Sequence, residues 1–160
     1  MMTTAPILSY PNFNKPFILS TDASTNGLGA VLSQKDEKGK EHPIWFASRT
    51  LSPAEKNYNI TEQEALAVVW AIKYFRRYLH GSRFLVETDH SALQWLLNQP
   101  TKENDNKRII RWKLMLQEYD FEVKYRKGKA NANVDTLSRI NKLKEPNTHP
   151  NNSTTDINNG

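Results

Sequence analysis

Two aspartates stand in matching sequence contexts. Residues 20–24 and 87–91 share the pattern Thr-Asp-x-Ser around Asp22 and Asp89, and each pattern ends an apolar, β-branched run that predicts a strand. If the two strands are parallel neighbours, both aspartates lie side by side at the carboxyl edge of the sheet, where open α/β folds bind their ligands. Either aspartate alone is better interpreted as a cap on the segment that follows it. Their repetition favours a shared function.

A third carboxylate, Glu64, falls in the apolar stripe of a helix predicted over 61–79. Thr61 with Gln63 and Glu64 resembles a capping box and predicts where this helix starts. An isolated carboxylate among apolar side chains costs roughly several kcal/mol unless it is paired, protonated or bound to a metal. A buried salt bridge or a neutral acid is therefore the alternative for Glu64. Glu62 points to the other side of the helix and is expected at the surface.

A cluster of carboxylates indicates a hard divalent cation, Mg²⁺ or Mn²⁺, because these ions prefer oxygen ligands. Two such ions about 4 Å apart can hold the attacking and leaving oxygens of an in-line phosphoryl displacement. Without cations to screen them, the acidic side chains would repel a phosphodiester. The expected chemistry is therefore metal-dependent hydrolysis of nucleic acid.

Composition narrows the class of protein. The chain has no cysteine, which excludes disulfides, thiolate zinc sites and cysteine nucleophiles and agrees with an intracellular location. Its 22 Lys and Arg residues against 17 Asp and Glu give a net charge of +5, a weak preference for a polyanionic partner. No apolar run approaches the roughly 20 residues of a membrane span, so no membrane partner is expected. The 160 residues suffice for one domain with a hydrophobic core.

The acids are positioned by a recognisable succession of elements. Three strands in hairpin succession, followed by strands that alternate with helices, indicate a mixed sheet with helices on its faces. The predicted strands are 16–22, 27–34, 42–48, 83–89 and 121–126, and the predicted helices are 61–79, 91–97, 107–119 and 133–139. Trp112 shares helical spacing with apolar residues, so it is interpreted as core rather than as a stacking platform for bases.

The segment from about Ala5 to Ile140 resembles the ribonuclease H region of gypsy-type LTR retrotransposon polyproteins. The shared motifs agree in order and spacing, which chance does not explain. They are Pro16–Ser24, Gly27–Gln34, Ala47–Leu51, Asn57–Tyr58, Thr61–Ala71, Phe75–Leu79, Thr88–His90, Arg111–Trp112, Glu118–Phe121, Tyr125, Gly128–Lys129 and Asp135–Arg139.

The resemblance implies an α/β, ribonuclease H-like fold: a five-stranded mixed sheet in the order 3-2-1-4-5, flanked by helices. It also implies a catalytic and metal-binding tetrad, carried over here as Asp22, Glu64, Asp89 and Asp135. In its own context near a predicted helix start, Asp135 is explained by the helix dipole, and only the resemblance gives it a role. The implied reaction is attack by metal-activated water on the RNA strand of an RNA–DNA hybrid. Two Mg²⁺ ions, or Mn²⁺ in their place, would take part, and the products would carry 3′-hydroxyl and 5′-phosphate ends.

On this interpretation residues 1–15 are the end of the polymerase connection, 16–140 the ribonuclease H-like domain and 141–160 a disordered, Asn-rich tail or linker. The expected partners are an RNA–DNA hybrid and the polymerase domain of the same polyprotein, in the cytoplasm or within retrotransposon particles. The alternative function is a non-catalytic tether that binds duplex or packs on the polymerase, against which the intact tetrad argues. A host-adopted copy with altered function is a second alternative.

A hybrid is recognised by its shape, through phosphates and 2′-hydroxyls. The residues predicted to contact it are Asn26, Arg126, Lys127 and Lys129. The three cations are expected at phosphates, whereas the Asn26 amide is expected at a 2′-hydroxyl. His90, beside Asp89, is interpreted as a turn or supporting residue, with a direct catalytic role as the alternative.

Overall fold

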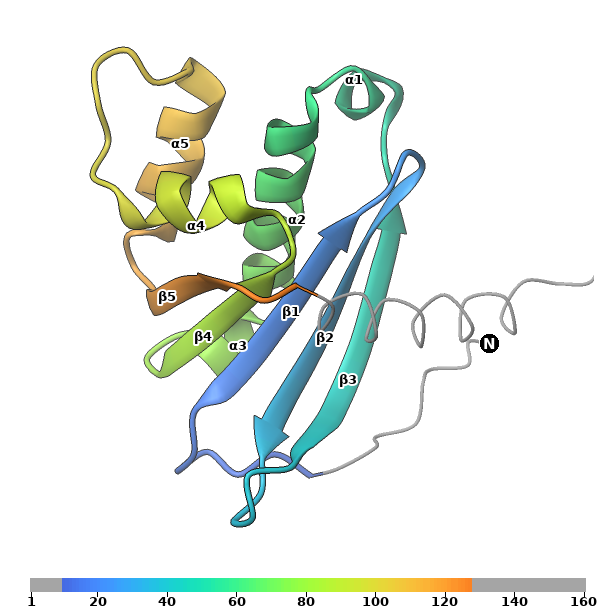
Figure 1. Ribbon diagram of the computed structural model, residues 1–160, viewed down its shortest axis with the longest axis vertical. Coiled ribbons are helices and arrows are strands. Elements are labelled where there is room, and N and C mark those ends of the chain that lie inside the picture. Colours follow the sequence, from blue (N-terminus) through green and yellow to red (C-terminus); the bar gives the residue numbers. More distant parts are fainter. Residues whose placement is uncertain (1–9, 128–160) are drawn as a thin grey trace, which may run out of the picture.

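A computed structural model describes residues 10–127, which form a single five-stranded mixed sheet with three longer helices packed on it (Figure 1). The strands are β1 (Phe17–Ala23), β2 (Gly27–Lys35), β3 (Glu41–Thr50), β4 (Arg83–Thr88) and β5 (Asp120–Tyr125). The helices are α1 (Pro53–Lys56), α2 (Ile60–Tyr74), α3 (Arg76–Leu79), α4 (Ser91–Asn98) and α5 (Lys107–Leu116). The sheet order is β3-β2-β1-β4-β5, which confirms the predicted fold class.

Strand β1 lies at the centre of the sheet, antiparallel to β2 and parallel to β4. The remaining pairs are β2 with β3, antiparallel, and β4 with β5, parallel. Phe17, Ile18 and Leu19 of this central strand are all buried. The register places Ser20 of β1 opposite Glu87 of β4, so the residues two positions further along each strand also come side by side.

Helix α2 packs along β1 and β2 in the main hydrophobic core. Several of its buried residues are small, including the fully buried Ala65, Ala67 and Ala71, and small side chains let a helix approach its neighbours closely. Trp112 of α5 is also buried and belongs to the same core, which confirms its predicted structural role. None of the helices in the described range is long and apolar enough to cross a bilayer.

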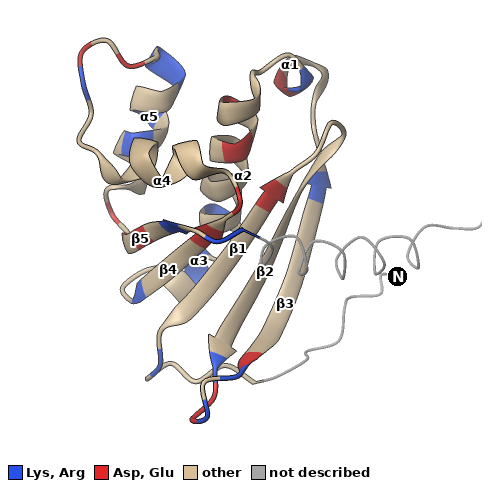
Figure 2. Cartoon of the chain, viewed as in Figure 1, with Lys and Arg blue, Asp and Glu red and all other residues tan. Residues whose placement is uncertain are grey.

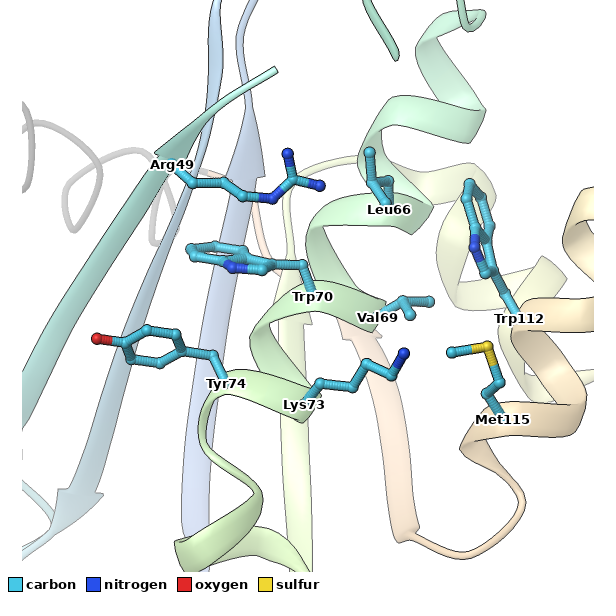
Figure 3. Close-up of a pocket in the computed structure, with 8 residues that line it drawn as sticks. All are labelled: Arg49, Leu66, Val69, Trp70, Lys73, Tyr74, Trp112 and Met115. Carbon is cyan, nitrogen blue, oxygen red and sulfur yellow. The ribbon is translucent and has the colours of Figure 1, made fainter. Parts of the chain in front are cut away.

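An open groove lies on the outer side of α2, between the end of β3 and α5 (Figure 3). Its lining is mainly apolar and aromatic and includes two cations. The lining residues are Arg49, Leu66, Val69, Trp70, Lys73, Tyr74, Trp112 and Met115. Among the residues that the structure describes, no acidic side chain lines this groove.

Two expectations about helices were wrong, and one helix was missed. The predicted single helix over 61–79 divides at Phe75, whose backbone leaves the helical region (φ −99°, ψ 23°). The break accompanies aromatic packing, since Tyr78 beyond it packs against Phe13 and Phe17 at the start of β1. The cap of α2 is Asn59, not Thr61. Helix α1 was not predicted, although Ser52-Pro53-Ala54-Glu55 carries the sequence signature of a capping box with proline at the first helical position.

Some predictions fall outside residues 10–127. They are the helical segment 133–139, Asp135, Lys129 and the tail 141–160. The domain boundaries also stay predictions.

Candidate metal centre

Three carboxylates from separate segments converge at one edge of the sheet. Asp22 stands near the end of β1, Glu64 in the second turn of α2, and Asp89 between β4 and α4. One carboxylate oxygen of each lies within 4.8 Å of the other two. Figure 2 shows acidic segments at the end of β1, in the first turns of α2 and at the loop after β4. The predicted juxtaposition of Asp22 and Asp89 is confirmed, and Glu64 joins them.

Tight turns hold the two aspartate-bearing strand ends in place. After β1, the Ser24 N–H donates to the Gly27 carbonyl (2.8 Å), and the Gly27 N–H donates to Ser24 Oγ (3.1 Å). A β-carbon at Gly27 would come within 2.8 Å of the Arg49 carbonyl oxygen on β3, so this position requires glycine. After β4, the His90 N–H donates to Thr88 Oγ1 (3.1 Å). These local bonds fix where the neighbouring aspartates leave the sheet.

The cluster is electrostatically strained without a cation. Burial, followed by the charges of Asp22 and Asp89, raises the pKa of Glu64 from 4.5 to about 8. Burial and the charge of Asp89 raise the pKa of Asp22 from 3.8 to about 6. In both cases a hydrogen bond from the backbone of Ala23 partly opposes the rise. Near neutral pH the metal-free cluster therefore holds at least one proton.

The residues present fit a divalent cation. Glu64 is 7% exposed, and its Oε1 has no hydrogen-bond partner among residues 10–127. A buried carboxylate oxygen without a donor is costly, and a cation coordinated by Asp22, Glu64 and Asp89 would satisfy it. Carboxylates alone, without sulfur or imidazole, are the donor set that Mg²⁺ and Mn²⁺ prefer.

Glu62 was predicted at the surface, and this was wrong. It is 7% exposed and accepts hydrogen bonds from Asn106 Nδ2 (2.7 Å) and Arg108 Nη1 (3.2 Å). Both donors lie at the start of α5, which packs beside α2. The periodicity of α2 alone contains no information about that neighbour, so no sequence signal predicted the burial of Glu62.

The predicted nucleic-acid contacts fall in different environments. Asn26 and Lys127 are exposed, and the Asn26 carbonyl anchors its turn by accepting the Leu51 N–H of the chain beyond β3 (3.0 Å). Arg126 is partly engaged, because its Nη1 donates to Glu87 Oε2 (2.9 Å) and Glu87 is fully buried. Sequence reasoning assigned no role to Glu87, although it shares a strand face with Asp89.

Solved structures of similar fold include ribonucleases H and reverse transcriptases. The RNase H1 of the archaeon Halobacterium salinarum matches with a TM-score of 0.55 at 13% identity, over 76% of this chain and 93% of that one. The foamy viral protease-reverse transcriptase solved with dsDNA matches with a TM-score of 0.59 at 22% identity, over 76% of this chain and 25% of that one. At such identities the likeness concerns the fold, which is ribonuclease H-like.

Sequence comparison defines the family within that fold. Residues 12–119 match the family model of the RNase H-like domain found in reverse transcriptase. The retrovirus-related Pol polyprotein from transposon 297 of Drosophila melanogaster is 50% identical over 135 residues, 84% of this chain and 12% of that protein. The transposon Tf2-3 polyprotein of Schizosaccharomyces pombe is 40% identical over 147 residues, 91% of this chain and 11% of that protein. The chain therefore belongs to the RNase H-like domains of reverse transcriptases in retrotransposon Pol polyproteins, and it spans a small part of these relatives.

Proposed function

We propose that this domain hydrolyses the RNA strand of RNA–DNA hybrids with the help of divalent metal ions. The observation that carries the proposal is the convergence of Asp22, Glu64 and Asp89 within 4.8 Å at the carboxyl edge of the sheet. Membership of the RNase H-like family supports nuclease chemistry. A structure of foamy viral protease-reverse transcriptase with an RNA/DNA hybrid, which shares this fold, agrees with the substrate class.

We assign the ions as two Mg²⁺, with Mn²⁺ as a substitute. Asp22, Glu64 and Asp89 would hold them, together with Asp135 on the strength of the resemblance. Bound ions of this kind activate water as a nucleophile and stabilise charge on a phosphoryl group. The protein contributes a rigid, partly buried arrangement of carboxylates. To bind a cation, the Glu64 carboxyl must release the proton that its raised pKa of about 8 retains at neutral pH.

We propose four residues that position the substrate: Asn26, Arg126, Lys127 and Lys129. Asn26 follows Asp22 by four residues and presents an exposed side chain for a 2′-hydroxyl. Lys127 is exposed and suited to a phosphate. Arg126 would contact phosphate with the part of its guanidinium that Glu87 does not engage. Lys129 completes the proposed set.

The full protein of the relatives is a polyprotein, so we also propose the polymerase part of the same polyprotein as a partner. The corresponding location is the cytoplasm or a retrotransposon particle.

The test is cleavage of a labelled RNA–DNA hybrid by the purified chain in Mg²⁺ and in Mn²⁺, with duplex DNA and duplex RNA alongside. We expect the RNA strand of the hybrid to be cut and both other duplexes to remain intact. Asp22→Asn is the matched control, because it removes a charge and keeps the shape. A folded wild-type chain that binds hybrid and cuts it with neither metal would instead indicate the non-catalytic tether.

A further inference from the structure

The first turns of α2 hold polar side chains that extend to three different neighbours. Thr61 reaches towards the loop after β4, Glu62 contacts α5, and Glu64 enters the acidic cluster. Glu64 follows Thr61 and Glu62 by less than one helical turn of about 3.6 residues. A shift of the turn that carries Thr61 and Glu62 therefore also moves Glu64. The direction of Glu64 therefore depends on how firmly this turn is held.

Glu62 holds the turn on the side of α5. Its carboxylate accepts the Asn59 N–H within α2's own capping box (3.3 Å) and the side chains of Asn106 (2.7 Å) and Arg108 (3.2 Å). The Arg108 guanidinium also stacks over the Tyr58 ring, 4.0 Å from its centroid. A nearly buried carboxylate with three donors from two segments is a stiff junction, because charge-assisted hydrogen bonds are strong and directional.

His90 holds the same turn on the side of the sheet. Its Nε2 lies 3.3 Å from Thr61 Oγ1, and its backbone N–H is bonded to Thr88 Oγ1. His90 directly follows Asp89. This contact therefore joins the segment that carries one acid of the cluster to the helix that carries another.

We propose that Glu62 and His90 are positioning residues that hold the first turn of α2 from two sides and thereby aim Glu64 at Asp22 and Asp89. The inference rests on the proposed metal-dependent function. Neither residue belongs to the group of side chains that could share an ion, which among the described residues consists of Asp22, Glu64 and Asp89. The carboxylate of Glu62 instead accepts its three donors and faces α5. Partners that orient metal ligands in this way typically change metal affinity by about 10- to 100-fold when removed.

The chain contains a matched control for Glu62. Glu55 is also the third residue of a capped helix, with Ser52 as its cap, and it pairs with Arg49 at 2.7 and 2.9 Å. The local chemistry of Glu55 and Glu62 is therefore the same, but α1 carries no acid of the cluster. Loss of a capping glutamate alone affects both variants in the same way, whereas loss of positioning affects the Glu62 variant only.

The experiment is calorimetric titration of the full 160-residue chain with Mn²⁺, together with urea unfolding of each metal-free variant. Glu62→Ala and Glu55→Ala should both unfold more easily than wild type. Only Glu62→Ala should bind Mn²⁺ about tenfold or more weakly. Glu62→Gln keeps an oxygen acceptor and should recover part of the affinity. Thr61→Val, which removes the hydroxyl facing His90 and keeps the side-chain shape, should weaken Mn²⁺ binding in the same direction.

Hybrid affinity in EDTA gives a second readout, because a shift of Glu64 alone leaves the substrate-contact residues unchanged. We expect the same hybrid affinity for Glu62→Ala and wild type. Equal Mn²⁺ affinity for wild type, Glu62→Gln and Thr61→Val would overturn the inference even if Glu62→Ala proved too unstable to study. Failure of the proposed function looks different, since wild type and Asp22→Asn would then bind Mn²⁺ equally weakly.

Discussion

Replacing Glu64 with glutamine should stabilise the metal-free domain and abolish its response to Mg²⁺. The pKa of Glu64 is raised from 4.5 to about 8. Between these values the native state retains a proton that the unfolded chain has lost. The free energy of unfolding therefore falls as pH rises through this range, by up to about 1.4 kcal/mol for each pH unit. Glutamine cannot ionise, so the free energy of unfolding of Glu64→Gln does not fall with pH for this reason.

The size of this fall in the free energy of unfolding depends on how far the pH rises above 4.5. From pH 4.5 to about pH 7 the loss for Glu64 reaches at most about 3 kcal/mol, and near pH 5 it is below about 1 kcal/mol. The glutamine amide brings donors into a site where Glu64 Oε1 has no hydrogen-bond partner among the described residues, which offsets part of the gain. We expect Glu64→Gln to be more stable than wild type by about 1–2 kcal/mol near pH 7, and by more than that near pH 8, where the loss in wild type is larger.

The assay is urea unfolding followed by tryptophan fluorescence, in EDTA and in excess Mg²⁺, near pH 5 and near pH 8. Mg²⁺ should stabilise wild type by mass action and leave Glu64→Gln unchanged. The reasoning fails if the variant is less stable than wild type in EDTA near pH 8, or if its advantage is equally large near pH 5. Either result would mean that Glu64 is not held in an unfavourable, cation-seeking environment.

Further predictions concern the protons of the acidic cluster and the cationic side chains of Arg126 and Lys127. Affinity for Mg²⁺ should rise as pH increases from about 6 to about 8, because Asp22 and Glu64 must lose protons with raised pKa values of about 6 and about 8; calorimetry in buffers of different ionisation enthalpy measures the released protons, and an affinity independent of pH contradicts the account. Arg126→Ala should lower the free energy of unfolding by about 1 kcal/mol, because it removes one charge-assisted hydrogen bond to the buried Glu87 and the Arg126 side chain is itself partly exposed to solvent; chemical unfolding measures the loss, and an unchanged free energy of unfolding contradicts this reasoning. Lys127→Ala should leave the free energy of unfolding unchanged. It should reduce the slope of log hybrid affinity against log salt concentration by about 1, which fluorescence anisotropy over a salt series measures.

The sequence predicted the acids of this site because their local contexts are informative. Two strands that end in Thr-Asp-x-Ser, around Asp22 and Asp89, indicate a common edge. Glu64 is conspicuous because a carboxylate in an apolar helical stripe needs an explanation. Periodicity alone predicted a mixed sheet with helices, whereas the strand order came from the family resemblance, because local patterns do not specify which strands pair.

The sequence could not predict contacts made between elements. Glu62 is buried by α5, and no property of α2 alone reveals that neighbour. The break at Phe75 reflects packing against the start of β1, since the residues around it are acceptable in a helix. The pairing of Arg126 with Glu87 depends on the parallel alignment of β4 and β5.

The most direct test of the central claim is a crystal structure of the chain soaked in Mn²⁺, with the metal located by its anomalous scattering. We expect an anomalous peak about 2.2 Å from carboxylate oxygens of Asp22 and Asp89, with Glu64 turned towards the same ion or its neighbour. Crystals that remain ordered at saturating Mn²⁺ and show no anomalous peak among these three side chains would contradict the account.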